Sequence, residues 1–414
     1  MSNILKKPTF SALKYKEFRT YIIARFFFIL VLTMQATLIS WKVFEITKDP
    51  FSIGLIGLFE FFPAFLMTFY SGYIIDKSDK RKLLFFSFAA NLLLTILFAY
   101  ITSATAKTHL SDTIILGSIY GIAFASGIAR AFSGPTSFAL LGNLVPKEEL
   151  SNAITWHSGS WQVAGVGGPA LAGILYGVIG ISFTFSLMIV MMIFAVVGAF
   201  LIKPKPPVKS ILVESMLQNI REGFRFVWRT KEILGVVSLD LFAVFFGGAT
   251  AMLPYFSDVI LHTGPAGLGL LRSAPALGAV AMMVLINFIP MHKNQGKIMM
   301  YCVAGFGVCI IVFGLSNMFW ISAIALFLSG LLDGISILVR STVLQLKTPE
   351  NMKGRVSSLN SIFIMSSNEL GAFESGFMAK FFGVIPSVIF GGAMTVGVVV
   401  FTWIKIPSIK KITY

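Results

Sequence analysis

Residues 72–82 read Gly-Tyr-Ile-Ile-Asp-Lys-Ser-Asp-Lys-Arg-Lys and form a charged stretch between two long hydrophobic segments. Each segment has enough apolar residues to cross a bilayer as a helix, which takes roughly 20 residues. Asp76 ends the first segment, and a basic cluster opens the second. One interpretation is a short cytoplasmic loop whose basic residues only set the orientation of the neighbouring helices.

The composition of the whole chain extends this pattern. Of the 414 residues, 56% are hydrophobic and only 12% are charged, a balance that soluble domains of this size do not show. About twelve crossings account for most of the length. The sequence therefore predicts an all-α membrane protein of twelve transmembrane helices, without a large extramembrane domain. The expected spans are 20–46, 52–75, 83–103, 113–143, 151–177, 181–202, 232–256, 267–290, 298–316, 320–345, 356–382 and 386–404.

The formal net charge of +15 raises the question of an anionic partner such as nucleic acid. Most of the 33 Lys and Arg residues fall on one side of the expected spans, and only Lys48 and Lys107 fall clearly on the other. This bias predicts a multi-pass membrane protein with both termini in the cytoplasm. The charge then faces anionic lipid of the bilayer, and no nucleic-acid partner is expected.

No pattern in the sequence indicates a cofactor or a metal. Cys302 and Cys309 lie two turns apart in one expected helix, too far apart for a disulfide, and the four His residues are scattered singly. A glycine-rich nucleotide loop is also missing, so ATP is not the expected energy source.

A polar segment, residues 203–231, divides the chain. It begins Lys-Pro-Lys-Pro-Pro and continues with apolar residues at helical spacing and basic residues opposite them. This pattern predicts a cytoplasmic linker with an amphipathic helix at the membrane surface. The linker would join an N-terminal six-helix bundle, residues 1–202, to a C-terminal six-helix bundle, residues 232–414.

Charged side chains inside the expected spans are candidates for function, because each costs about 2.5–3.5 kcal/mol to place at the centre of a membrane helix. An alternative is that they form buried ion pairs that only fix the packing of the helices. The carboxylates are Glu60, Asp240, Asp333, Glu369 and Glu374, and the arginines are Arg25, Arg130, Arg272 and Arg340.

Such carboxylates suit proton coupling. In general, burial favours the protonated form of a carboxylate and a nearby arginine favours the ionised form. We expect Glu369 and Asp240 to carry protons, followed by Glu60, with Asp333 and Glu374 as further candidates. The four arginines, and Asn368 in a polar run of the eleventh span, could hold a polar or anionic part of a substrate or neutralise a carboxylate.

Small residues mark places where helices can approach closely. Gly168, Pro169 and Gly173 lie in the fifth span, and Gly371 and Gly376 take the corresponding places when the two halves are aligned. The same alignments place Glu60 over Arg272 and Arg130 over Asp333. Two related bundles that each provide one wall of a shared cavity would show such a pattern.

The loop after the second span resembles the signature loop of the major facilitator superfamily. The pattern Gly-x-x-x-Asp-[Arg/Lys]-x-x-[Arg/Lys]-[Arg/Lys] is matched at Gly72, Asp76, Lys77, Lys80 and Arg81, although Asp79 stands where the family usually has glycine. Arg130 and the Gly-Pro stretch of the fifth span resemble two further motifs, the second typical of antiporters. Residues 146–153, 167–173 and 349–356 resemble the branch that contains the enterobactin exporter and macrolide efflux pumps.

This resemblance implies a monomeric secondary carrier with two pseudo-symmetric bundles, which rock about a midplane site while the loop at Asp76 acts as a gate. Members of the branch commonly export siderophores or amphipathic, multidrug-type molecules by proton antiport. The first hypothesis is therefore a proton-coupled exporter, and the second is a proton-coupled importer of a siderophore or small metabolite. A membrane-embedded enzyme or receptor is the third, and no convergent nucleophile and base supports an enzyme.

Overall fold

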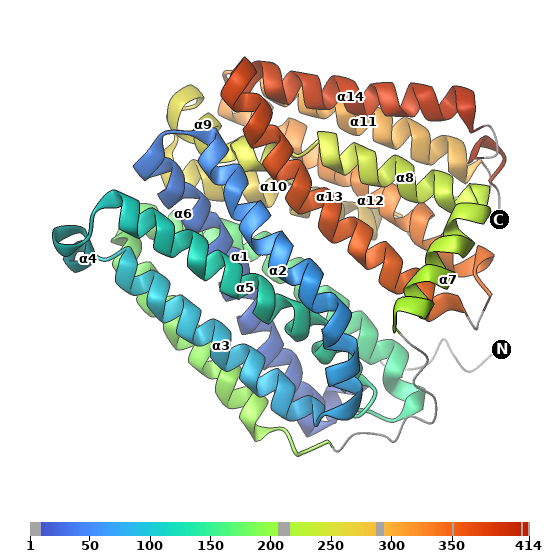
Figure 1. The fold of residues 1–414 in the computed structure, drawn as a ribbon, viewed down its shortest axis with the longest axis horizontal. Helices are drawn as coiled ribbons and strands as arrows, with labels where there is room; N and C mark the ends of the chain where they lie inside the picture. Colours follow the sequence, from blue (N-terminus) through green and yellow to red (C-terminus); the bar gives the residue numbers. More distant parts are fainter. Residues whose placement is uncertain (1–9, 206–215, 287–293, 350–351, 407–408, 413–414) are drawn as a thin grey trace. The chain divides into compact units, whose positions relative to one another are not determined.

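The computed structural model is helical throughout the part of the chain that it describes, residues 10–205, 216–286, 294–349, 352–406 and 409–412 (Figure 1). No strand occurs in these ranges, so the predicted all-α fold is confirmed. Within them, ten helices are long and apolar enough to cross a membrane. Residues 206–215 of the expected linker and 287–290 of the expected eighth span lie outside the described residues.

The first half of the chain forms six of the numbered α-helices. They are α1 (Lys16–Thr47), α2 (Pro50–Lys77), α3 (Lys80–Ile101), the short α4 (Ala104–His109), α5 (Asp112–Leu141) and α6 (Leu150–Leu201).

The second half begins with α7 (Met216–Arg229), which the single residue Thr230 separates from α8. The helices that follow are α8 (Lys231–Phe246), α9 (Leu253–Tyr255), α10 (Gly264–Leu285), α11 (Gln295–Leu315), α12 (Phe319–Lys347), α13 (Lys353–Phe382) and α14 (Val384–Lys405). A π-helical turn, Phe256–Ile260, lies between α9 and α10.

Helix α6 contains a break that makes it two segments. Its 52 residues include Gly180, whose backbone has φ 78° and ψ 170°. Glycine takes this conformation without a steric penalty from a side chain. An unbroken helix of this length would extend about 80 Å, more than twice the roughly 30 Å of a hydrocarbon core. The break falls between the expected fifth and sixth spans.

Helix α13 is long enough to cross a membrane but is not among the ten apolar candidates. Its sequence includes Asn360, Ser366, Ser367, Asn368 and Glu369. Counting the two segments of α6 separately and adding α13 would give the expected twelve spans, and this count stays a prediction.

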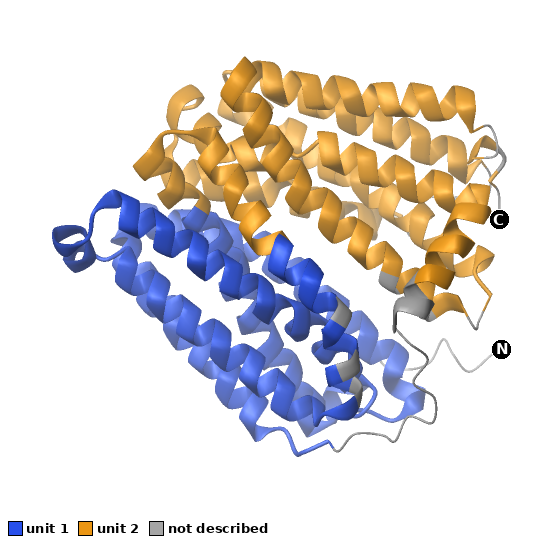
Figure 2. Cartoon of the chain, viewed as in Figure 1, with its two compact units in different colours: residues 1–39, 62–212 blue, residues 40–61, 213–414 orange. Residues whose placement is uncertain are grey.

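The chain forms two compact units (Figure 2). Unit 1 contains residues 1–39 and 62–212, and unit 2 contains residues 40–61 and 213–414. The predicted bundles follow the order of the sequence and stay a prediction, whereas unit 2 also includes residues 40–61 from the first half of the chain. Close packing inside unit 2 explains this, because a Cβ added at Gly54 of α2 would lie 3.0 Å from the carbonyl oxygen of Ala372 in α13.

In unit 1, α1 packs against α6 at the small residues of the fifth span. Gly168 is buried, and a Cβ there would lie 3.1 Å from the carbonyl oxygen of Leu30. Pro169 and Gly173 are buried in the same segment. The hydroxyl of Thr33 donates a hydrogen bond to the carbonyl oxygen of Ala164 at 3.1 Å. A larger side chain at Gly168 would therefore push the two helices apart.

In unit 2, the glycines of α13 lie against two different helices. A Cβ at Gly371 would lie 2.6 Å from the carbonyl oxygen of Phe245 in α8, and one at Gly376 would lie 3.1 Å from the Cα of Gly54 in α2. Helix α13 thus packs closely against α8 and against the N-terminal part of α2.

Candidate functional site

Asp79 holds the loop between α2 and α3. It stands where the signature loop of the major facilitator superfamily usually has glycine. Asp79 is the N-cap of α3, and its Oδ1 accepts hydrogen bonds from the backbone N–H groups of Arg81 at 2.9 Å and Lys82 at 3.4 Å. The same oxygen accepts the N–H of Lys205 at 3.2 Å. An N-cap aspartate satisfies otherwise unpaired donors of the first helical turn. We did not predict this role, although an Asp directly before a hydrophobic helix is a known N-cap signal.

The other residues of this loop have different environments. The guanidinium of Arg81 donates to the carbonyl oxygen of Phe200 and lies 4.9 Å from the centre of that ring. Gly72 is half-buried with no atom within 4 Å of an added Cβ, Lys80 is half-buried and Lys77 is exposed. The side chain of Asp76 lies outside the described residues, so its gating role stays a prediction.

Arg25 joins three helices of unit 1. It is 7% exposed, its Nε donates to the hydroxyl of Ser137 at 3.2 Å, and an Nη donates to the carbonyl oxygen of His157 at 2.7 Å and to Ser160. In the described ranges it makes no ion pair with a carboxylate. Its hydrogen bonds to α5 and α6 indicate a role in holding α1 in place.

Arg130 of α5 is exposed within the chain. Its expected partner, Asp333 of α12, belongs to the other unit, so that pairing stays a prediction. Asp333 is half-buried and makes no hydrogen bond or ion pair with the residues that the structure describes. Glu374 of α13 is also half-buried and makes no hydrogen bond or ion pair with the described residues.

Asn368 of α13 is exposed, and its Nδ2 donates to the carbonyl oxygen of Ile364 at 2.8 Å.

Four helices of unit 2 bring polar residues together around Arg272 of α10. Its guanidinium donates to the hydroxyl of Ser40 in α1 at 3.0 Å. It also has attractive electrostatic interactions with Glu369 of α13 and Glu60 of α2. We call these four residues the Arg272 cluster. Three of them were predicted as site residues from their depth in the spans, and Ser40 was not.

Gly57 of α2 lies directly against Glu369 of this cluster. A Cβ at Gly57 would lie 3.0 Å from the carbonyl oxygen of Glu369 and 3.3 Å from its Oε2. A side chain at residue 57 would therefore occupy the space that the Glu369 carboxylate uses. Gly57 is a site residue that the sequence reasoning did not select.

The charges of the Arg272 cluster do not balance. Two carboxylates, Glu369 and Glu60, interact with one guanidinium, so the fully ionised cluster carries one negative charge in excess. Excess charge is costly in a membrane interior, so this cluster differs from a closed ion pair.

Asp240 and Arg340 form a second, balanced site between α8 and α12. Both residues are 5% exposed, their side chains form an ion pair, and Ser336 donates to Asp240 Oδ1 at 3.5 Å. Each charge is neutralised by the other, so this pair resembles a structural link between helices more than the Arg272 cluster does.

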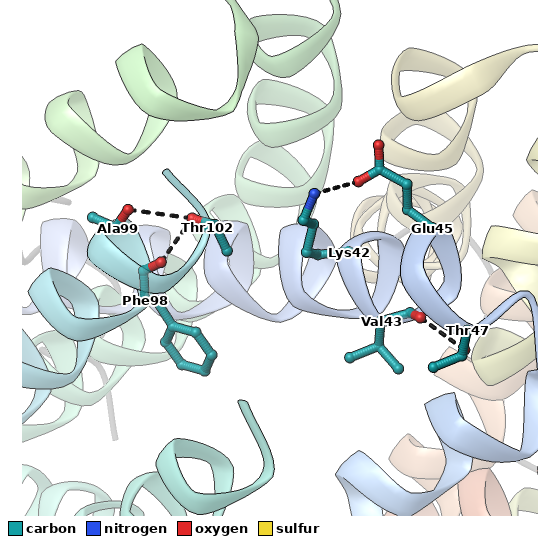
Figure 3. Close-up of polar contacts among 7 residues, drawn as sticks. All are labelled: Lys42, Val43, Glu45, Thr47, Phe98, Ala99 and Thr102. Atoms are coloured by element: carbon teal, nitrogen blue, oxygen red, sulfur yellow. Dashed lines mark hydrogen bonds and ion pairs between the residues drawn. The ribbon is translucent and has the colours of Figure 1, made fainter. Parts of the chain in front are cut away.

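A third charged site, an ion pair, lies near the C-terminal end of α1 (Figure 3). The Nζ of Lys42 is 2.6 Å from Oε2 of Glu45, and Lys42 is 3% exposed. We did not predict these two as site residues. Their spacing of three positions, which places side chains on the same helix face, was the available signal.

Charges kept inside the helices of a multi-pass helical protein are typical of membrane carriers. Comparison with known proteins agrees with this class. Residues 7–413 match the model of one family, and the chain is a member of the transmembrane secretion effector family.

The curated relatives are similar over most of their length. The enterobactin exporter EntS of Citrobacter koseri is 24% identical over 369 residues, which cover 86% of this chain and 83% of the relative. The enterobactin exporter EntS of Shigella dysenteriae serotype 1 is 23% identical with the same coverage. The family and these relatives are transporters, so the prediction of a carrier and not an enzyme is confirmed.

Solved structures support the fold. A D-xylose-proton symporter superposes with a TM-score of 0.74 at 12% identity, covering 97% of this chain and all (100%) of that one. A bacterial homologue of the iron transporter ferroportin gives 0.71 at 13% identity, with 96% and 99% covered. The chain therefore has the major facilitator fold, and the predicted resemblance is confirmed.

Proposed function

We propose that this protein is a proton-coupled exporter of a siderophore or a related amphipathic small molecule. It would act as a monomer in the bacterial inner membrane, with both termini in the cytoplasm, by alternating access. The names of the relatives support export of this substrate class. The observation that carries the proposal is the Arg272 cluster, in which two glutamates share one arginine inside the membrane-spanning helices.

The unequal charges of the cluster account for coupling. When Glu60 and Glu369 are both ionised, Arg272 can neutralise only one of them, and the excess negative charge can bind a hydrogen-bond donor or a positively charged group of the substrate. A proton on Glu369 removes this excess charge and so displaces the substrate. Proton and substrate therefore exclude one another, as antiport requires.

Glu369 is the better of the two candidates for the proton. It lies on α13, the most polar of the long helices, and its carboxylate lies against Gly57 at the contact between α13 and α2. Protonation there would change the charge at a helix contact as well as in the cluster. Asp240 is the weaker candidate because its ion pair with Arg340 is already balanced.

The test is transport in proteoliposomes with an imposed pH gradient. Candidate siderophores and amphipathic drugs are offered to wild type, Glu369→Gln, Glu60→Gln and the double variant, and both proton flux and substrate movement are recorded. We expect Glu369→Gln to abolish gradient-driven movement and to retain exchange of substrate for substrate. Asp112→Asn, at an exposed residue that begins α5 and is no member of the Arg272 cluster, is the control and should behave as wild type.

Equal gradient-driven transport by all three cluster variants would overturn the proton assignment. Accumulation of substrate on the cytoplasmic side under an inward proton gradient would replace export by import, since the same charge exchange can serve either direction.

A further inference from the structure

One face of α7 is fixed against the rest of unit 2. Val227 is 3% exposed and belongs to the hydrophobic core of that unit. A Cβ at Gly223 would lie 3.2 Å from the carbonyl oxygen of Arg355, and Glu222 forms an ion pair with the Arg355 side chain at the start of α13. These contacts fix the rotation of α7, labelled in Figure 1, about its own axis, and this rotation determines which of its residues are exposed.

The outward face combines arginines with an aromatic pair. Arg221, Arg225 and Arg229 follow one another at intervals of four residues, are exposed, and make no hydrogen bond or ion pair with any residue in the described ranges. Phe224 and Trp228 are 47% and 63% exposed, and their rings stack with centres 5.7 Å apart. At about 100° per residue, the aromatic pair lies directly beside the arginine row.

The place of α7 in the chain puts this face at a membrane boundary. Helix α7 ends at Arg229, and α8, a candidate span, begins at Lys231. Tryptophan is enriched at the level of lipid headgroups, and arginine binds phosphate oxygens through its planar set of donors. In water alone the Phe–Trp pair would leave a large apolar surface exposed, whereas the headgroup region accommodates both residue types.

We propose that the exposed face of α7 is a binding surface for anionic phospholipids. The three arginines would contact the headgroup phosphates, and Phe224 and Trp228 would lie at the boundary with the acyl chains. The surface is separate from the Arg272 cluster and does not depend on what is transported or in which direction. Because Glu222 pairs with Arg355, bound lipid would also stabilise the contact of α7 with α13.

The fluorescence of Trp228 tests this proposal. The full-length protein is placed in two kinds of liposome with equal bromolipid content. One contains brominated phosphatidylglycerol with unbrominated phosphatidylcholine, and the other contains brominated phosphatidylcholine with unbrominated phosphatidylglycerol. The difference in tryptophan quenching between wild type and Trp228→Phe isolates the signal from this residue. Since a basic residue at an anionic surface strengthens binding about fivefold, we expect clearly stronger quenching by the anionic bromolipid, and a decrease as salt is raised.

The decisive variant is Arg221→Gln/Arg225→Gln/Arg229→Gln, and the matched control is Lys147→Gln/Lys347→Gln/Lys405→Gln. The control removes the same charge from three exposed residues elsewhere. The arginine variant should lose the preference for anionic lipid, and the control should keep it. Inorganic phosphate added at constant ionic strength should not reduce the quenching. Equal quenching by the two lipids in wild type, or loss of the preference in the control as well, would overturn the proposal.

Discussion

At the scale of single residues, the partners of a buried charge decide what that charge can do. Asp240 and Glu369 are both carboxylates inside spans of unit 2. Asp240 has one arginine to itself, whereas Glu369 shares Arg272 with Glu60. A balanced pair is stable in its ionised form, and our proposal assigns the exchange of a proton to the unbalanced group of three. We therefore expect stability to depend on Asp240 and coupling on Glu369.

Removing one partner of the Asp240–Arg340 pair should destabilise the protein strongly. Breaking a buried ion pair typically costs about 3–5 kcal/mol, because the remaining charge is left without compensation. Thermal unfolding in detergent should show a lower midpoint for Asp240→Asn and for Arg340→Gln. The double variant should unfold at a higher temperature than either single variant, and a double variant as unstable as the sum of the two would contradict this account.

Asp79 should contribute to stability through its backbone contacts. Replacing an N-cap aspartate by alanine costs about 0.5–2 kcal/mol, and here the N–H of Lys205 also loses its acceptor. Asp79→Ala should therefore lower the unfolding midpoint, and Asp79→Asn, which keeps an acceptor oxygen, should lower it less. An alanine variant as stable as wild type would show that the cap is dispensable.

The sequence located most of these charges but not their partners. Glu60, Arg272 and Glu369 were selected because each lies deep in an expected span, which hydropathy alone shows. Whether these three side chains lie close together depends on which faces of α2, α10 and α13 pack against one another. No local sequence pattern shows which faces pack. Ser40 and Gly57 were missed for the same reason, since a serine or glycine in a membrane helix becomes informative only when its neighbour is known.

At the scale of helices, the contact between α2 and α13 depends on glycine. Gly54 and Gly57 lie in the N-terminal part of α2, and Gly376 lies opposite Gly54. Small residues allow such close approach in membranes, where apolar side chains gain little by leaving lipid. Sequence reasoning identified Gly376 through the weak repeat between the halves, but it did not predict that α2 would be its neighbour.

A larger side chain at Gly376 should separate these helices. Overpacking a close contact costs about 1–3 kcal/mol, so Gly376→Val should lower thermal stability and reduce transport. Gly397→Val in α14 is the matched control, because no atom lies within 4 Å of a Cβ added there. If the two variants lose stability equally, the close approach is not the cause.

At the scale of the whole molecule, the division between the units passes through α1 and α2. Residues 40–61, which we call the outer hairpin, belong to unit 2 although they lie early in the sequence. Lys48 near its tip forms an ion pair with Asp258, with Nζ and Oδ2 2.9 Å apart. Composition and the signature loop predicted the class and fold, but a division drawn from sequence order could not assign this hairpin to the second half.

If alternating access requires the outer hairpin to leave unit 2, a bridge across the Lys48–Asp258 contact should stop transport. Cysteines are introduced at both residues in a background without Cys302 and Cys309, and a short bis-methanethiosulfonate cross-linker, which joins the two thiols through reducible disulfides, is added. We expect transport to cease on cross-linking and to return on reduction. Each single-cysteine variant treated in the same way is the control, and continued transport by the cross-linked protein would contradict this mechanism.

The polarity of α13 also affects how the protein is made. A segment with so many Ser, Asn and Glu residues is poorly retained in the bilayer by the insertion machinery when it is presented alone. Only Gly383 separates α13 from the strongly apolar α14. The two helices should therefore enter the membrane together as a hairpin during synthesis. A chain that stops after Phe382 would leave α13 without this neighbour, and we expect quality-control proteases to degrade it.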